Sequence, residues 1–463
     1  MNEFAQLVAS ANSVLWGVYC LIPLLVGTGI YFTWRLRFVQ LRHLILAFRF
    51  VFKGTGAFGM KADKEGMSSF QSLTTAVAAQ VGTGNLAGVA TAIALGGPGA
   101  IFWMWIAAFF GMATIFVEAV LAQIYRIRGK DGHITGGPAY YISQGLGSKP
   151  LAYFFSFSII IALGFIGNMV QSNSISEAFQ SAFGVPYYVA GVVVVLLAGF
   201  VLFGGVKRLA STTEKLVPLM AFVYVLGGMF VIFANYDQII PAFKMVFIGA
   251  FNPEAATGGV IGASVKEAIR YGVARGLFSN EAGMGSTPHA HALAKVRDPI
   301  HQGLVAIVGV FIDTFIVLNI TAFVIFTTGA IDDHTTGIAL TQKAFTLGLG
   351  HYGMPFVAVC LFFFAFSTII GWCFFGEQNV KYLFGVRWVG IYRMTVLCFL
   401  ALGSYLQVNL VWELADFFNG LMVLPNLLAL IALTKVVEKA FHAFEYGLPP
   451  PKLYRGKRAA KFK

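Results

Sequence analysis

Charged residues are scarce in this chain of 463 residues. Asp, Glu, Lys and Arg together make up 11% of it, against about 25% in an average soluble domain. Hydrophobic residues make up 58%, and the mean hydropathy is +0.77. So few charged side chains could not cover the surface of a water-soluble fold, which excludes that class. We therefore predict an all-α polytopic membrane protein.

Cysteine is also rare, and the patterns of metal or redox sites are missing. The four cysteines lie inside apolar runs, without the spacing of a zinc site or a disulfide framework: Cys20, Cys360, Cys373 and Cys398. His289 and His291 are followed by no acidic or cysteine partner, so we expect no zinc site. Because no nucleophile, metal cluster or cofactor motif is present, we expect no enzyme. No basic segment precedes the first apolar run, so we also expect no removable signal peptide.

Acidic residues are outnumbered by basic ones, 20 to 32, which gives a net charge of +12. The apolar runs predict eleven spans: 14–34, 68–95, 98–126, 150–175, 185–205, 214–235, 260–294, 302–328, 353–376, 389–408 and 412–434. If the N-terminus is outside, only Lys244 and Lys343 fall in outer connections, and nearly all other basic residues fall in cytoplasmic ones. The charge is thus a topology signal for N-terminus outside and C-terminus inside, and we expect no nucleic-acid partner.

Several connections are amphipathic. Residues 36–52 combine arginines with apolar side chains, which predicts a basic helix on the inner leaflet. Residues 239–251 and 338–349 predict short helices at the outer surface. The basic tail from Pro449 onward is expected to contact anionic membrane lipids.

The second span is interrupted near its middle by Gly82, Thr83, Gly84 and Asn85, which are poor helix formers. Backbone groups freed by such a break must be satisfied by protein or by a polar ligand in a cavity. We predict a broken helix whose ligand is a small zwitterionic solute with a cation.

The same feature recurs in the seventh span. Placing Ala79 on Ala274 aligns four pairs of identical residues without a gap: Ala79 with Ala274, Asn85 with Asn280, Ala87 with Ala282, and Gly88 with Gly283. The two spans run in opposite directions in the predicted topology, so the repeat is inverted. We predict an extra N-terminal helix and basic segment (1–66), a first five-helix repeat (67–236), a second (257–434) and a basic cytoplasmic tail (435–463).

A string at the start of the third span carries a family resemblance. Gly97-Pro98-Gly99-Ala100-Ile101-Phe102-Trp103-Met104-Trp105-Ile106-Ala107-Ala108-Phe109-Phe110-Gly111-Met112 resembles the signature of the sodium:alanine (alanine or glycine:cation) symporter family of the amino acid–polyamine–organocation superfamily. This resemblance implies the LeuT-type five-plus-five inverted-repeat fold with one extra N-terminal helix. It also implies a multi-pass protein of the prokaryotic cell (inner) membrane, expected to work as a monomer.

The break suggests a substrate site. Amides around Gly82, Thr83 and Gly84 lie at a half-helix N-terminus, where a positive dipole end favours a carboxylate. Gln80 either contacts the ligand or ties the half-helices together, and Asn168 is either a pocket residue or an interhelical hydrogen-bonding group. Two aromatic side chains are candidate walls around the solute: Phe278 and Trp372.

The cation site follows partly from the break and partly from the resemblance. Carbonyls left free at Ala78 and Val81 suit a hard cation such as Na⁺. The resemblance to LeuT-type carriers adds the Phe364 carbonyl and the hydroxyls of Ser367 and Thr368 in the ninth span. These would make five neutral oxygens for co-transported Na⁺.

Acids inside the membrane are costly unless paired. Asp313 either joins a second cation site with Asn85 or pairs with Arg270 or Arg275, and Arg270 is also a candidate for an outer gate. Two further acids are expected to accept hydrogen bonds from freed backbone N–H groups: Glu118 and Glu281.

These features together predict a sodium-coupled symporter of L-alanine or glycine, with D-alanine as a further candidate, that works by alternating access. The alternative is a proton-coupled or differently selective small amino acid transporter of the same fold. An ion channel would instead present a symmetric filter or a ring of charges.

Overall fold

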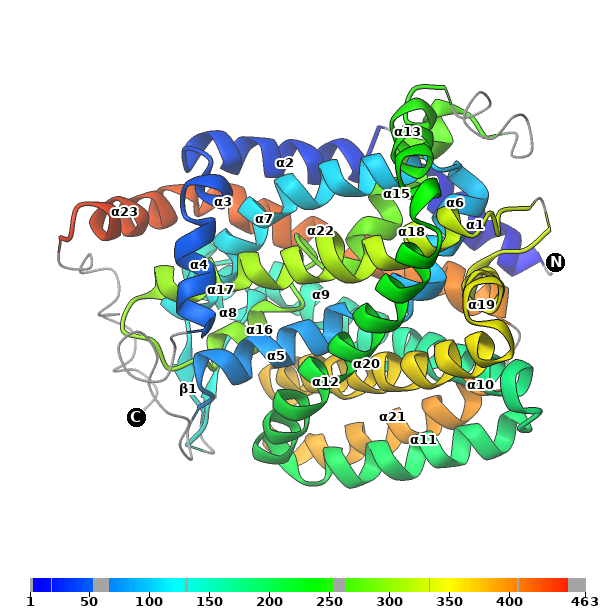
Figure 1. Ribbon diagram of the computed structural model, residues 1–463. Coiled ribbons are helices and arrows are strands. Elements are labelled where there is room, and N and C mark those ends of the chain that lie inside the picture. Colours follow the sequence, from blue (N-terminus) through cyan, green and yellow to red (C-terminus); the bar gives the residue numbers. More distant parts are fainter. Residues whose placement is uncertain are drawn as a thin grey trace.

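A computed structural model describes residues 3–17, 19–52, 66–129, 132–252, 263–332, 334–405 and 408–448. The predicted start of the second repeat at 257 and the tail from Pro449 lie outside these residues. Helices dominate the described chain, and most run along one common direction (Figure 1). A two-stranded antiparallel hairpin, β1 (Ile127–Arg128) with β2 (Ile134–Thr135), is a small exception to the predicted all-α class.

Within the described residues, seven helices are long and apolar enough to cross a membrane, or eight with a pair bent by 48°. That pair is α5 (Ser69–Gln80) with η1 (Gly84–Gly88) and α6 (Val89–Gly96). This confirms a polytopic helical membrane protein. The remaining predicted spans are shorter helices, such as α11 with 16 residues, so the number eleven stays a prediction.

The N-terminal region differs from its prediction. Instead of one helix at 14–34, it forms α1 (Glu3–Leu15) and α2 (Leu21–Arg35). The predicted basic helix at 36–52 is likewise divided into α3 (Val39–Arg42) and α4 (Leu44–Phe52). Arg37 and Phe38, with φ of 52° and 58°, lie in the left-handed region between α2 and α3. Two successive left-handed residues cannot continue a right-handed helix, so the chain turns there.

The two broken helices begin alike and run in opposite directions. Ser68 and Ser264 each form a capping box with the residue three positions on, which starts α5 and α15 (Val265–Asn280). Residues 281–287 interrupt the second helix before α16 (Pro288–Ala292). Met67, before α5, pairs with Ala294, after α16. At the other end, a Cβ on Gly96 of α6 would lie 3.2 Å from the Glu267 carbonyl oxygen of α15.

π-helical turns interrupt three spans near these breaks. They are η1, η3 (Ile160–Gly167) between α9 (Lys149–Ile159) and α10 (Asn168–Phe183), and η5 (Phe311–Leu318) between α17 (Pro299–Val310) and α18 (Asn319–Thr327). Such turns leave backbone groups out of the regular α-helical pattern and are frequent at functional sites.

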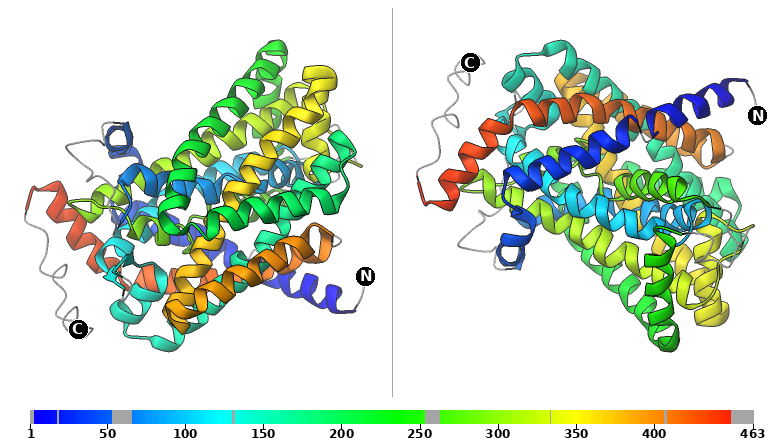
Figure 2. Two further views of the ribbon diagram at one scale, coloured as in Figure 1. Left: turned by 90° about the horizontal axis from the view of Figure 1, so that it is seen from below. Right: turned by 90° about the horizontal axis from the view of Figure 1, so that it is seen from above.

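The remaining elements complete the bundle. They are α7 (Ala100–Ile124), α8 (Pro138–Tyr141), η2 (Ile142–Leu146), α11 (Tyr187–Leu202), α12 (Gly205–Ala234), η4 (Tyr236–Gln238), α13 (Ile239–Gly249), α19 (Gly337–Leu349), η6 (Gly350–Tyr352), α20 (Gly353–Phe384), η7 (Val386–Trp388), α21 (Val389–Gly403), α22 (Val408–Ala432) and α23 (Thr434–Glu445). Helices α13 and α19 confirm the two short helices predicted between spans. Helices α1 and α23 lie at opposite ends of the bundle (Figure 2).

Candidate functional site

The first break is held by side-chain amides. Asn85 accepts the Gly82 N–H at its Oδ1, at 3.0 Å, and its own N–H donates to the Gly82 carbonyl at 3.3 Å. The Thr83 N–H donates to Gln171 Oε1 at 3.3 Å. Two of the amides predicted to bind a carboxylate are therefore already bonded to neutral side-chain oxygens of this chain. Such oxygens satisfy the freed amides without adding a charge.

Glycine at the break is required by packing as well. A Cβ on Gly82 would lie 2.3 Å from Thr368 Oγ1, and one on Gly84 would lie 3.1 Å from the Ser279 Cα. The first distance is shorter than side-chain packing permits. Close helix packing therefore requires glycine at both positions, against α20 at Gly82 and against the other broken helix, α15, at Gly84.

The second break repeats the chemistry of the first. Asn280 accepts the Ala282 N–H at its Oδ1, at 3.1 Å, as Asn85 accepts that of Gly82. These two asparagines are the ones that the repeat brings into register. Gln80 Nε2 donates to the Asn280 carbonyl at 2.7 Å, so Gln80 connects the two breaks. The expected bond between the two half-helices of the first break is thus not what the structure shows: Gln80 donates to the other broken helix.

Five oxygens predicted for Na⁺ converge between α5 and α20. Ser367 Oγ lies 3.2 Å from the Ala78 carbonyl oxygen and 2.8 Å from that of Phe364. Thr368 Oγ1 lies 3.0, 3.1 and 3.4 Å from the carbonyl oxygens of Ala78, Phe364 and Val81. All five residues are buried. Neutral carbonyl and hydroxyl oxygens are ligands for a hard cation, and the five that the residues supply fit Na⁺.

Several buried polar atoms near the breaks have no hydrogen-bond partner among the described residues. They are Gln80 Oε1, Thr83 Oγ1 and Asn168 Oδ1. Asn168 Nδ2 donates to the Gly164 carbonyl at 3.0 Å and lies 3.2 Å from Cys373 Sγ. An unpaired buried polar atom costs free energy comparable to a lost hydrogen bond, so these atoms favour a polar ligand.

The predicted aromatic walls meet each other. The rings of Phe278 and Trp372 lie edge to face, 5.9 Å between centroids, and Trp412 of α22 lies 5.5 Å from Phe278 on a third helix. A Cβ on Gly84 would lie 3.4 Å from Phe278 Cδ1. Phe278 therefore lies against the first break although it belongs to the second.

Comparison with known proteins agrees with this arrangement. The model of the sodium:alanine symporter family matches residues 1–449. The chain belongs to this family. It is 43% identical to the sodium/alanine symporter AgcS of Methanococcus maripaludis, over 96% of this chain and 97% of that protein. It is 42% identical to the probable sodium/glutamine symporter GlnT of Bacillus subtilis, over 94% and 89%.

Solved structures show the fold. The crystal structure of MhsT in complex with L-phenylalanine matches with a TM-score of 0.59 and 13% identity, over 85% of this chain and 96% of that one. The fold is the LeuT-type arrangement, as predicted. Membership in a family of amino acid symporters also makes the chain a multi-pass membrane transporter and not an enzyme.

Asp313 of this symporter joins the two breaks. Its carboxylate accepts Asn85 Nδ2 at 2.7 Å, Ser279 Oγ at 2.9 Å and Thr314 Oγ1 at 2.9 Å. Arg275 instead pairs with Asp416, so the predicted Asp313–Arg275 pair is wrong. Arg270, the other predicted partner, lies with its guanidinium over the ring of Tyr271.

The other two buried acids behave differently from each other. Glu118 of α7 accepts the N–H groups of Gly283 and Gly285 at 3.2 and 2.9 Å, which confirms its prediction. Glu281 accepts side chains, Ser286 Oγ and Trp372 Nε1, so the prediction of backbone donors is wrong there. Glu281 has a φ of 58°, and its left-handed backbone ends α15. A non-glycine residue held in that region costs about 1–3 kcal/mol, which the surrounding contacts must offset.

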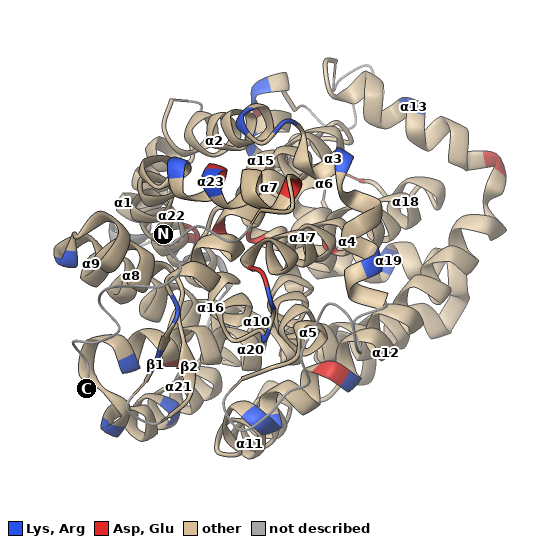
Figure 3. Ribbon diagram, turned by 90° about the vertical axis from the view of Figure 1, so that its left-hand side faces the viewer, with Lys and Arg blue, Asp and Glu red and all other residues tan. Residues whose placement is uncertain are grey.

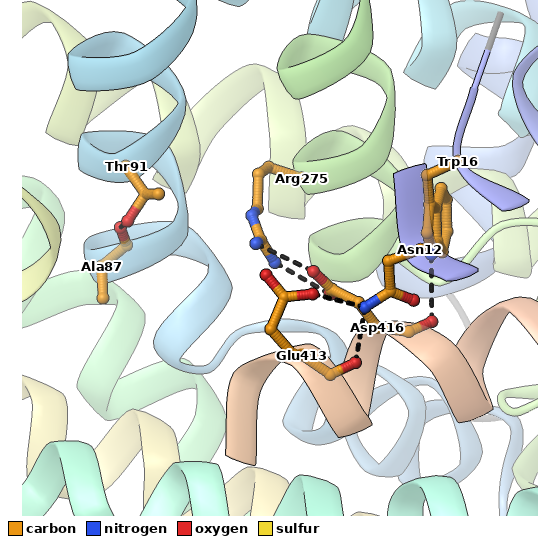
Figure 4. Close-up of polar contacts among 7 residues, drawn as sticks. All are labelled: Asn12, Trp16, Ala87, Thr91, Arg275, Glu413 and Asp416. Atoms are coloured by element: carbon orange, nitrogen blue, oxygen red, sulfur yellow. Dashed lines mark hydrogen bonds and ion pairs between the residues drawn. The ribbon is translucent and has the colours of Figure 1, made fainter. Parts of the chain in front are cut away.

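A polar cluster on α15 and α22 lies one and a half turns before the second break. Arg275 binds Asp416 with two N–H groups, each at 2.9 Å, and its guanidinium lies over the Trp412 ring. Helix α1 and the residue after it join this cluster, because Asn12 of α1 donates to Glu413 and Trp16 donates to the Asp416 carbonyl (Figure 4). The ion pair of the cluster thus involves Arg275 rather than Arg270, the gate candidate from the sequence.

The sequence predicted α22 as the span 412–434, but its polar residues were not among the predicted site residues. Trp412, Asp416, Asn419 and Asn426 share one face of this helix by their spacing. Asp416 contacts Arg275, and Asn426 Nδ2 donates to the Gly283 carbonyl at 2.9 Å. Asn419, between them in the sequence, is buried, and both of its polar side-chain atoms lack a partner among the described residues. Three polar residues at helical spacing in an apolar span were a signal that the sequence did contain.

Proposed function

We propose that this protein is a sodium-coupled symporter of small neutral amino acids, L-alanine and glycine above all. The observation that carries the proposal is the convergence of five buried neutral oxygens from α5 and α20. Such a set binds a monovalent cation without leaving a formal charge to be compensated inside the membrane. The names of the relatives also support sodium and alanine, although GlnT is named for glutamine.

The substrate is proposed to bind where the two breaks face each other. Thr83, Gly84 and the unpaired oxygens of Gln80 and Asn168 supply polar contacts there, and Phe278 and Trp372 supply apolar ones. A carboxylate would replace the side-chain oxygens that now accept the Gly82 and Thr83 N–H groups. D-alanine is a further candidate, since none of these contacts by itself distinguishes the L from the D enantiomer.

The proposed cation site and the proposed substrate site share one short segment of the chain, which can couple the binding of the two ligands. Val81 supplies a carbonyl to the cation site, and the next residue, Gly82, lies against Thr368 and begins the substrate site. Ordering of this segment by either ligand favours binding of the other. By linkage, each ligand then raises the affinity for the other by the same factor.

Asp313 supports the second proposal, an additional cation or proton site. It is a fully buried carboxylate that contacts Asn85, Ser279 and Thr314, and it has no Lys or Arg among its described contacts. A carboxylate without a basic partner is costly in a membrane, so a bound cation or proton would stabilise it. This observation keeps proton coupling as the alternative to purely sodium-driven transport.

The distribution of basic residues supports an orientation in the membrane. We propose the prokaryotic cell (inner) membrane, with the N-terminus outside and the C-terminus in the cytoplasm. Viewed from the end of the bundle that carries β1 and α23, several elements show Lys and Arg (Figure 3). That end would be cytoplasmic by the positive-inside rule.

Uptake into proteoliposomes tests the proposal. Labelled alanine should accumulate when an inward sodium gradient is imposed, and should only equilibrate with equal sodium on both sides. An inward proton gradient without sodium should give no accumulation. Accumulation driven by protons alone would replace sodium coupling with the alternative, and flux at channel rates would overturn the symport mechanism.

A further inference from the structure

The side chain of Trp372 is held in place by contacts on several sides. It lies on α20 one turn after Thr368, so it shares a helix face with the cation site. Its indole ring is fully buried and meets Phe278 edge to face. In the proposed function, this ring forms a wall of the substrate site. The position of the indole therefore determines how much room an amino acid side chain has.

Glu281 holds one edge of the indole. Trp372 Nε1 donates to Glu281 Oε1, while Ser286 Oγ donates to Oε2 of the same carboxylate. Glu281 is fully buried, at the end of α15, three residues after Phe278. The second broken helix thus supplies both the ring that faces Trp372 and the acceptor that fixes its orientation.

Gly167 limits the other side of the indole. This last residue of η3 is so close to the six-membered ring that a Cβ would lie 2.6 Å from Cζ3 and 2.9 Å from Cε3 of Trp372. Real Cβ atoms essentially never come that close to another atom. The Cβ could not shift away from the indole either, because the backbone carbonyl oxygen of Ala162 lies 2.8 Å from it. Any larger residue at 167 would displace the indole away from η3.

We propose that Glu281 and Gly167 are positioning residues that set the largest amino acid side chain that this symporter accepts. Neither needs to touch the substrate, because both act through the indole of Trp372. The inference rests on the proposed function, since it assumes that Phe278 and Trp372 enclose the amino acid side chain. Apolar pockets discriminate by about 10- to 200-fold for each methylene, so a small displacement of the ring changes selectivity measurably.

The test compares substituted proteins for inhibition of labelled-alanine uptake by glycine, L-alanine, L-serine, L-threonine and L-glutamine. Glu281→Gln retains an acceptor for the indole N–H and a donor for Ser286, so its substrate spectrum should match wild type. Glu281→Leu has similar bulk without an acceptor, so threonine or glutamine should inhibit at least ten-fold better than in wild type. Gly167→Ala should change the ratio of glycine to alanine affinity at least five-fold.

Matched controls separate positioning from general damage. Gly164→Ala alters the same π-helical segment but meets Tyr392 instead of Trp372, and Glu118→Gln alters a buried acid that does not contact the indole. Neither should change the order of the five amino acids. In a double mutant with Trp372→Phe, Glu281→Leu should have no further effect on that order, because its action passes through Trp372.

An unchanged order in both Gly167→Ala and Glu281→Leu would overturn the inference, and so would a changed order in Glu281→Gln. If Glu281→Leu does not fold, Gly167→Ala and Glu281→Gln still decide the question. Failure of the proposed function looks different, because wild-type protein would then show no sodium-driven alanine uptake at all.

Discussion

Thr368 is the most informative residue to change in the proposed cation site. Its hydroxyl oxygen is within 3.4 Å of three carbonyl oxygens, those of Ala78, Val81 and Phe364, whereas Ser367 Oγ contacts only two of them. Thr368→Val keeps the shape of the side chain and removes this oxygen. The Thr368 hydroxyl can coordinate Na⁺ while its hydrogen donates to the Phe364 carbonyl one turn back.

The magnitude follows from the loss of one polar contact to a charged group, about 1.5–3 kcal/mol. This corresponds to a change in affinity of about 10- to 150-fold. Part of this loss in sodium affinity is offset, because the substitution also destabilises the sodium-free protein, which loses the hydrogen bond from Thr368 to the Ala78 carbonyl, at 3.0 Å. We therefore expect the sodium concentration for half-maximal uptake to rise about 10- to 50-fold, at the low end of that range.

The assay is initial alanine uptake into proteoliposomes over a series of sodium concentrations. Thr327→Val is the control, because that hydroxyl bonds only the Phe323 carbonyl within α18, at 2.7 Å. It should leave the sodium dependence unchanged. Uptake by Thr368→Val should approach the wild-type rate at saturating sodium. If Ser367→Ala and Thr368→Val both stay within two-fold of wild type, the cation does not bind at these oxygens.

Three further predictions concern the breaks and the outer cluster. Gly82→Ala should abolish alanine binding in folded protein, because its Cβ would lie 2.3 Å from Thr368 Oγ1; near-native affinity in a binding assay would contradict this packing argument. Asp313→Asn keeps the shape but removes the charge, so the apparent charge moved per alanine in electrogenic transport should fall; an unchanged charge would show that Asp313 carries no ion or proton. Asp416→Asn weakens the bidentate pair with Arg275, so a cysteine introduced by Phe278→Cys should react several-fold faster with a thiol reagent added from outside, as expected for loss of a partly buried pair. An unchanged reaction rate would show that the pair does not restrict access from outside.

Local patterns in the sequence were enough for the class, the breaks and the repeat. Apolar runs of about 20 residues predict spans whatever their neighbours are, because the bilayer itself is the solvent that they must match. Gly82 and Gly84 interrupt a helix through their own conformational freedom, and the register of Asn85 with Asn280 is visible along the chain. The similar cap-like roles of these asparagines agree with that register. The family string at 97–112 added the expected fold.

Tertiary structure alone decided which polar groups meet. Asn12 lies 401 residues from Glu413, and the pairing of Thr368 with Ala78, 290 residues apart, was predicted only through the family resemblance. No local pattern records such distant pairings, so Arg275 could be assigned to Asp313 on the sequence although it binds Asp416. The position of the Trp372 side chain between Gly167 and Glu281 depends in the same way on three separate spans, which contain η3, α20 and α15. Helix periodicity orients a side chain on its own helix, but only packing determines which neighbour it faces.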